Sequence, residues 1–210
     1  MPLSQSQVGS NRLSSDNATL LLIDHQIGLM QLVRDYEPDE FKNNILALAD
    51  IGLTFNLPTI LTTSFEKGPN GPLLPELKQK FPYSPYIPRP GQINAWGNED
   101  FVKAVKKTGR KKLLIAGIVT DVCVAFPTIS ALAEGYEVYV VVDASGTFNR
   151  SVKEAALIRM SNAGAVLINW FALASELQKD WRNDGDKLKK ILQHRLVPYA
   201  GLISSYETKK

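Results

Sequence analysis

Short runs of apolar residues alternate along the chain with segments in which apolar positions recur at the spacing of a helix. Polar or turn-forming residues bound each run, and its length suits a strand that is buried on both faces. We therefore expect strands at residues 18–23, 58–63, 112–117, 137–142 and 165–168.

Helical periodicity follows most of these runs. After Pro38, the residues Phe41, Ile45 and Leu48 recur on one face, which is typical of a helix packed on a sheet. Because strands and helices alternate, the pattern predicts a parallel sheet with helices on both faces and right-handed crossovers. The other expected helices cover about residues 99–108, Cys123 to Gly135, 151–163, 170–180 and 184–194.

Residues 64–98 are the long stretch in which this alternation is lost. They are rich in proline and glycine, yet they contain aromatic residues such as Phe65 and Tyr83. Long irregular segments of compact domains are usually functional or disordered, and the aromatic side chains favour a packed loop that covers a site. Residues 18–210 are predicted to form a single domain after a flexible, serine-rich tail over residues 1–17.

Composition and charge narrow the possible partners and location. The 210 residues carry a net charge of +3, and no basic stripe interleaved with aromatic residues occurs, so nucleic acid is not an expected partner. One cysteine cannot form an internal disulfide, and no stretch reaches the length of a membrane span. Residues 1–17 lack the apolar core of a signal peptide. We expect a cytoplasmic protein without membrane partners; a cleaved organellar presequence is the alternative for the tail.

Cys123, the sole cysteine, is the first candidate for chemistry. It follows the apolar run at 112–117 and begins the expected helix. The positive end of a helix dipole favours a thiolate, and ligands of open α/β sheets bind at the carboxyl ends of the strands. The pattern therefore indicates a nucleophile.

Asp24 and Arg89 are the candidate partners of this thiol. Asp24 ends the first strand, so its carboxylate should lie at the same edge of the sheet as Cys123. Arg89 lies between two prolines, which hold the backbone extended. A guanidinium held there can pair with Asp24 and lower the pKa of the thiol. Each residue also has a purely structural interpretation. Taken separately, Asp24 is a helix or loop cap, and Arg89 is a loop arginine that donates to a backbone carbonyl.

Other mechanisms fail on residue spacing. A phosphatase loop needs an arginine six residues after the cysteine, where Ile129 stands, and a thioredoxin-type pair needs a second cysteine. The chain has two histidines, His25 and His194, without metal-ligand spacing, and a structural role is favoured for His25. No Gly-x-Ser-x-Gly elbow occurs, which argues against a serine nucleophile of that kind. No dinucleotide fingerprint follows any expected strand. From the histidine spacing and the missing fingerprint, we expect neither a metal nor a cofactor.

Three segments carry a resemblance to a known family. The sequences LIDHQ at 22–26, PTILT at 58–62 and GIVTDVCV at 117–124 resemble the isochorismatase-like superfamily of cysteine hydrolases. The segments at 63–66, 68–72, 93–96 and 180–184 look most like its YcaC-type octameric hydrolases of unassigned substrate.

The resemblance implies a fold and a catalytic triad. The fold is a three-layer α/β/α sandwich with a six-stranded, mostly parallel sheet. The triad is Asp–Lys–Cys, with Asp24 and Cys123 in place and Arg89 at the lysine position. Arginine stays charged and donates in a fixed fork, so Arg89 can hold Asp24 but cannot shuttle protons. The histidine ligands of the nicotinamidase branch are missing, which disfavours that specificity.

The resemblance also implies an oxyanion hole and a small pocket. A non-proline cis peptide is expected at Val119–Thr120, turning backbone N–H groups of Val119, Thr120 and Cys123 toward one point. Pro127 deprives the Cys123 carbonyl of its usual helical partner. The side chains expected to line the substrate pocket are Gln26, Phe65, Asn94 and Trp96.

These observations predict a cysteine hydrolase that cleaves a small amide or related C–N bond through a thioester. The substrate remains open. One alternative is a non-catalytic assembly or binding protein that keeps the pocket but has lost turnover, and another is a redox-sensing thiol at Cys123. The resemblance implies a homo-octamer of two stacked four-subunit rings.

Overall fold

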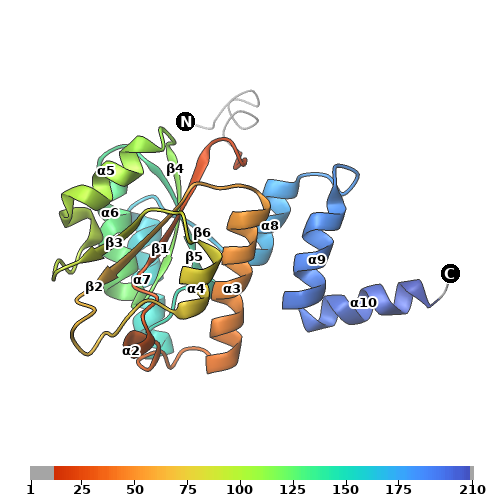
Figure 1. Cartoon of the computed structure of the whole chain (residues 1–210), viewed down its shortest axis with the longest axis horizontal. Coiled ribbons are helices and arrows are strands. Elements are labelled where there is room, and N and C mark those ends of the chain that lie inside the picture. The colour runs from red at the N-terminus through yellow and green to blue at the C-terminus, as the bar shows by residue number, and fades with distance from the viewer. Residues whose placement is uncertain (1–11, 209–210) are drawn as a thin grey trace.

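A six-stranded sheet forms the centre of the molecule (Figure 1), as described by a computed structural model for residues 12–208. The strand order is β3-β2-β1-β4-β5-β6, and every neighbouring pair is parallel. The strands are β1 (Ala18–Ile23), β2 (Thr59–Ser64), β3 (Tyr86–Arg89), β4 (Lys112–Gly117), β5 (Glu137–Val141) and β6 (Val166–Ile168).

Helices cover both faces of this sheet (Figure 1). One face packs against α3 (Pro38–Thr54), α4 (Pro75–Lys80) and α8 (Trp170–Gln178), and α9 (Gly185–Arg195) packs on the outer side of α3 and α8. The other packs against α5 (Glu99–Lys107), α6 (Ala125–Ala133) and α7 (Arg150–Asn162). Successive β1 residues point to opposite faces, so Leu20 and Leu22 enter the first core while Leu21 and Ile23 enter the second. The expected three-layer α/β/α sandwich is confirmed, with a sheet that is entirely parallel.

The stretch at 64–98 is more regular than its composition indicates. It contains α4, the edge strand β3 and a short 3₁₀ turn at Ala95–Gly97. Strand β3 is the one strand of the sheet that the apolar pattern did not predict. Its pattern is hard to recognise because it has four residues, one of them Pro88. Proline is tolerated there because β3 pairs only with β2 and lies at the edge of the sheet.

The C-terminal part holds three helices rather than the two expected. After α8 and α9, residues Val197–Glu207 form α10, which begins with a proline in its first turn. Helix prediction relies on a polar face opposite an apolar one, and this segment lacks a charged residue before Glu207, so the usual pattern is absent. A short helix α2 (Ile27–Met30) follows β1.

The expected flexible tail needs a correction over residues 12–17. Leu13 is fully buried in the core, and its N–H donates to Glu176 Oε1 at 3.2 Å, so this part of the segment packs onto α8. The remainder of the expected tail lies outside the described residues. Among residues 12–208, no helix is long and apolar enough to cross a membrane.

Cys123 does not sit in the first turn of a regular α-helix. After β4, residues Thr120–Val124 form a single π-helical turn that leads into α6. The N–H of Val124 donates to the Val119 carbonyl at 3.2 Å, which is the wider i to i+5 spacing. Pro127 in α6 lacks the N–H that would bond to the Cys123 carbonyl, so a regular helical bond at that position is impossible.

Candidate active site

Asp24, Arg89 and Cys123 meet at the carboxyl end of the sheet. Asp24 follows β1, Arg89 ends β3 on the far side of β2, and Cys123 lies in the turn after β4. The Arg89 Nη2 group donates to Asp24 Oδ1, and both side chains are fully inaccessible to solvent. The three residues come from loops and strand ends separated by many residues, and parallel pairing alone brings them together.

Acceptors surround the guanidinium of Arg89. Its Nε donates to Thr62 Oγ1 at 3.0 Å, and its Nη1 donates to the backbone carbonyls of Gln92 and Ile93. Together with Asp24, these contacts use each of its three nitrogen atoms. Such a group is a fixed positive charge that also ties the segment after β3 to the centre of the sheet.

Burial and charge oppose each other at Asp24. Burial raises the pKa of its carboxyl, while the neighbouring Arg89 guanidinium lowers it, and burial is the larger effect. The second oxygen, Oδ2, accepts no conventional hydrogen bond from the described residues. Asp24 and the thiol of Cys123 lie close enough for each to shift the pKa of the other. The carboxylate thus has one oxygen committed to Arg89 and one open to a proton.

The resting thiol differs from the expected thiolate. Burial raises the pKa of Cys123 above its ordinary value, the negative charge of Asp24 raises it further, and the Arg89 charge offsets only part of this. The expectation that the helix end would favour the thiolate is therefore wrong for the unliganded protein, whereas the expected lowering of the thiol pKa by Arg89 is present but is outweighed. The reason is that the thiol is partly buried, and that its strongest electrostatic neighbour is the Asp24 carboxylate rather than the guanidinium.

The cis peptide lies one bond earlier than expected. It joins Ile118 and Val119, not Val119 and Thr120. None of the three residues is proline, so their side chains give no sign of which bond is cis. The N–H of Thr120 donates to the Gly146 carbonyl at 3.0 Å and is already engaged. The backbone N–H of Val119 interacts with the thiol of Cys123 and lowers its pKa.

A network around Thr147 holds the cysteine turn in place. Thr147 is fully buried, and its Oγ1 donates to Asp121 Oδ1 at 2.7 Å. Its N–H donates to Asp35 Oδ1 at 2.8 Å, and its carbonyl accepts from the N–H of Arg34 at the same distance. Thr147 therefore joins the loop before α3 to the turn that carries Cys123. Sequence reasoning missed this residue because its partners are distant along the chain.

Gln26 has a structural role in the unliganded protein. It is fully buried, its Nε2 donates to the carbonyls of Ser64 and Gly71, and its Oε1 accepts from the Ser64 N–H at 2.8 Å. Both donors and the acceptor are thus used in closing the loop after β2. Among the expected pocket residues, Gln26 supports the wall of the site rather than facing its interior.

Asn94 and Trp96 also make contacts away from the triad. Asn94 Oδ1 accepts from the N–H of Trp96, and its Nδ2 donates to Ser130 Oγ at 3.1 Å. The Trp96 indole packs edge-on against Phe101 and donates to Glu134 Oε1 at 2.8 Å. The structure therefore does not bring Trp96 to the thiol. Trp96 instead lines a separate cavity together with residues of α5 and Glu134.

Phe65 is the expected pocket residue that remains available. It is 52% exposed, adopts a positive φ of 50°, and lines a cavity of about 370 Å³ beside Arg89. The other lining residues of this cavity are Glu66, Lys67, Pro88 and Pro90. A volume of this size suits a small molecule.

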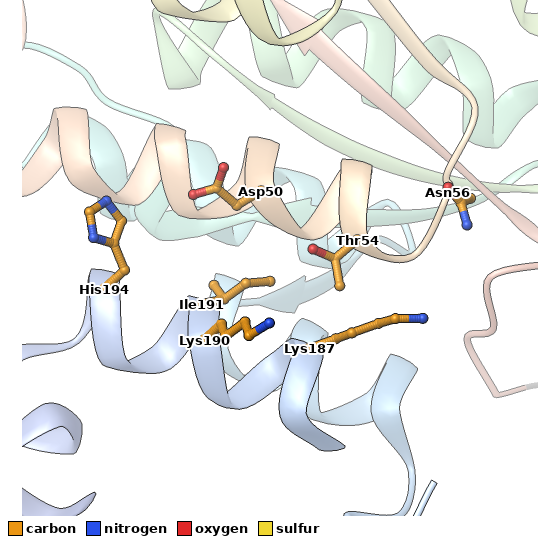
Figure 2. A pocket seen from close by; sticks show the side chains of 7 residues that line it. All are labelled: Asp50, Thr54, Asn56, Lys187, Lys190, Ile191 and His194. Atoms are coloured by element: carbon orange, nitrogen blue, oxygen red, sulfur yellow. The ribbon is translucent and has the colours of Figure 1, made fainter. Parts of the chain in front are cut away.

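A larger, shallow cavity of about 540 Å³ lies far from this chemistry, between α3 and α9 (Figure 2). Figure 2 shows Asp50 and Thr54 on α3 facing Lys190 and His194 on α9. None of the candidate catalytic residues lines it, and Asp50 is already paired with Lys80 and Arg195. Its size alone therefore does not make it the active site.

His25 and the acidic residues do not form a metal centre in the described part of the chain. Within residues 12–208, no three His, Cys, Asp or Glu side chains gather so that they could hold an ion. His25 is fully buried, and its Nε2 lies 3.0 Å from the Ala144 carbonyl. Burial lowers the pKa of His25 to about 4, so the ring is neutral near pH 7 and serves the packing beside the site.

Comparisons with known proteins agree with this fold. Residues 18–171 match the Isochorismatase domain family. The chain is 61% identical over 197 residues to the probable hydrolase YcaC of Escherichia coli K12, a match that covers 94% of this chain and 95% of that protein.

Two solved structures are especially similar. YcaC from Pseudomonas aeruginosa, solved with hexane-2,5-diol and covalent acrylamide, is 62% identical with a TM-score of 0.94, and the match covers 98% of this chain and 100% of that one. The Escherichia coli YcaC gene product, an octameric hydrolase of unknown specificity, is 60% identical with a TM-score of 0.94, covering 95% and 98%.

The electrostatic coupling predicts that Asp24→Asn makes the thiol more reactive. Removing the negative charge lowers the pKa of Cys123, so a larger fraction is thiolate at any given pH and alkylation accelerates. The measurement is the rate of Cys123 alkylation by iodoacetamide between pH 6 and 9. The matched control is Asp16→Asn, an exposed position, which should leave the profile unchanged. An Asp24→Asn profile that is unchanged, or moved to higher pH, contradicts the coupling.

The Thr147 network predicts that Thr147→Val lowers the free energy of unfolding by about 1–3 kcal/mol, because the hydrogen bond to a charged Asp121 is lost. Thr147→Ser keeps the hydroxyl and should retain most of the stability. Urea denaturation of both variants measures this. A Thr147→Val variant as stable as the wild type would contradict the contribution of the hydrogen bond.

Proposed function

Because this chain belongs to the isochorismatase family, whose relatives include probable hydrolases, we propose that it is a cysteine hydrolase acting on small molecules with an amide or related C–N bond. The observation that carries the proposal is the buried Arg89–Asp24 ion pair, placed beside the single cysteine of the chain. A carboxylate held in a dry site and coupled to a thiol is the arrangement that nucleophilic catalysis needs.

The reaction begins with a proton transfer. As the sulfur of Cys123 attacks the carbonyl carbon, its proton passes to Asp24, and the carbonyl oxygen becomes an oxyanion that the backbone N–H groups of Val119 and Cys123 are proposed to stabilise. The C–N bond then breaks and Asp24 returns the proton to the leaving nitrogen. What remains is a thioester on Cys123.

Water completes the cycle. Asp24 takes a proton from water as the oxygen attacks the thioester carbon, the C–S bond breaks, and the sulfur regains that proton. The raised pKa of Asp24 suits this role, because a carboxyl that both accepts and donates works best when its pKa approaches the working pH. The neutral resting thiol suits it as well, since its proton is delivered only when a substrate is attacked.

Arg89 acts in this scheme as a positioning charge. It holds Asp24 in one orientation and lowers the pKa of the carboxyl, which offsets part of the effect of burial. An arginine cannot exchange protons near neutral pH, so the proton movements are assigned to Asp24 alone. The cavity that Phe65 lines is proposed to hold part of the substrate; of the three candidate catalytic residues, Arg89 alone is in its lining.

Covalent acrylamide in the Pseudomonas aeruginosa relative supports a reactive nucleophile in this group of proteins. Acrylamide is an electrophilic small amide, and the single thiol of this chain is Cys123. The octameric Escherichia coli relative supports a homo-octamer for this chain too. A single domain over residues 18–210 and a cytoplasmic location complete the proposal.

The scheme predicts a thioester on Cys123. Incubation of the protein with a panel of small primary amides and chromogenic anilides, followed by rapid acid quenching and intact-mass measurement, should reveal an acyl adduct that Cys123→Ala lacks. Asp24→Asn should abolish turnover although its thiol alkylates faster. Turnover that survives Cys123→Ala would overturn the mechanism; alkylation without any turnover would favour the non-catalytic binding protein.

Arg89→Lys separates the charge of Arg89 from its fork of donors. Lysine should retain the pairing with Asp24 but lose bonds to the carbonyls of Gln92 and Ile93, lowering the free energy of unfolding by about 1–3 kcal/mol. In the pH profile of kcat/KM, the acid limb of Arg89→Lys should stay near that of the wild type, because a positive charge still opposes the rise in the Asp24 pKa. Arg89→Met removes that charge, and the limb should move to higher pH. Identical limbs in Lys and Met variants contradict the role given to Arg89.

A further inference from the structure

Lys153 is a largely buried lysine that the proposed chemistry does not use. It lies four residues into α7, and only 12% of its side chain is exposed. Its Nζ lies 3.1 Å from Asp35 Oδ2 and 3.6 Å from the centroid of the Tyr36 ring. Asp35 and Tyr36 are consecutive residues of the loop between α2 and α3, so one ammonium group contacts both side chains of this loop.

This position of Lys153 does not stabilise its own helix. The N-terminal end of a helix carries a positive partial charge and favours acidic side chains, and Lys153 lies near that end of α7. Burial lowers the pKa of Lys153, and the negative charge of Asp35 is the largest of the opposing effects. The contacts that favour a lysine here are therefore those with residues outside α7.

Asp35 is the group that depends on this charge. Its side chain is 1% exposed, and its Oδ1 accepts from the N–H of Thr147 at 2.8 Å. Its Oδ2 accepts no conventional hydrogen bond from the described residues, and its ion pair is with Lys153. Removal of one partner of a buried ion pair is strongly destabilising, because the remaining charge is left uncompensated.

From Asp35 the contacts continue to the turn that carries the cysteine. Two consecutive residues hold this turn from outside. The Gly146 carbonyl accepts from the N–H of Thr120 at 3.0 Å, and Thr147 Oγ1 donates to Asp121 Oδ1 at 2.7 Å. Since Asp35 accepts from the N–H of the same Thr147, the buried ion pair is linked to the turn through one residue.

The turn over Thr120–Val124 depends on such support. It is a single π-helical turn, a structure that is rare and frequent at functional sites. Pro127 leaves the Cys123 carbonyl without its usual helical partner. A displacement of about 1 Å at a reacting group can cost roughly 100-fold in rate, so the position of this turn matters for a nucleophile.

We propose that Lys153 is a positioning residue for Cys123: its buried charge holds Asp35, Asp35 holds Thr147, and Thr147 holds the turn that carries the thiol. The inference rests on the proposed function, because the position of the thiol matters for turnover only if Cys123 is the nucleophile. Lys153 acts through these contacts and not on the substrate.

The first test measures the order of the turn itself by hydrogen–deuterium exchange with mass spectrometry. In Lys153→Met, peptides that cover residues 119–125 should exchange about tenfold faster, while peptides that cover α5 keep their wild-type rate. Lys153→Arg retains the charge and should restore the protection to within about threefold. The matched control is Arg150→Met, which removes an exposed ion pair from the same helix and should leave the exchange unchanged.

The second test separates positioning from stability. With a substrate from the amide panel, the kcat of Lys153→Met should fall by about 10- to 100-fold per folded molecule, and KM should change much less. The assay is run well below the unfolding midpoint of each variant, and circular dichroism gives the folded fraction. Lys153→Arg should recover most of kcat, and Arg150→Met should equal the wild type. A merely structural lysine would lower the unfolding midpoint and leave kcat per folded molecule unchanged.

The double variant Asp35→Asn/Lys153→Met tests the charge that links Lys153 to the turn. Asparagine keeps an oxygen that accepts from the N–H of Thr147, and it removes the charge that Lys153 balances. The double variant should therefore be closer to the wild type than Lys153→Met, both in exchange over residues 119–125 and in kcat. Losses that simply add would show that the two residues act independently.

The outcomes distinguish this inference from the proposed function. Wild-type exchange over residues 119–125 in Lys153→Met overturns the role of Lys153 and leaves the hydrolase chemistry standing. An equal loss of kcat in Lys153→Met and Arg150→Met also overturns it. A wild type that forms no acyl adduct and turns over no amide overturns the proposed function, and the exchange rates then decide alone whether Lys153 holds the turn.

Discussion

The buried ion pair between Arg89 and Asp24 is the constraint on which the site depends. Removing two charges from water is costly, and a buried pair is tolerated only where further hydrogen bonds satisfy both groups. Arg89 meets that condition through Thr62 and two backbone carbonyls as well as Asp24. These contacts come from β1, β2 and the segment after β3, so the charge can be buried only when the sheet edge is fully formed.

The same pair determines the character of the nucleophile. Arg89 lowers the pKa of Asp24 against the larger effect of burial, and the negative charge of Asp24 in turn raises the pKa of Cys123. Proton and charge are thus divided between two groups, with the proton on sulfur at rest. A lysine at position 89 would offer one compact charge with three rotatable donors, whereas the arginine fork holds two backbone carbonyls as well as Thr62 and Asp24. The site gains rigidity and gives up a group that could exchange protons.

Sequence patterns predicted the parts of the molecule that depend on local order. The apolar runs located five strands, and Asp24 and Cys123 followed from their position directly after two of them. The patterns failed for residues whose role depends on hydrogen-bond partners that are distant along the chain. Trp96 and Gln26 have side chains suited to a pocket, yet Glu134 and Ser64 use their polar groups elsewhere. Thr147 has no local signature at all, since its role lies in contacts to Asp35 and Asp121.

The sequence pattern also failed to predict helix α10. Amphipathic periodicity reports which side of a helix faces the core of its own chain, and α10 has no clear division into one apolar and one polar side. Arg89 and Leu202 pose opposite problems, a charge inside and an apolar side chain outside. The first is solved within one chain by hydrogen bonds, whereas a singly exposed apolar side chain such as Leu202 is common on protein surfaces and needs no partner.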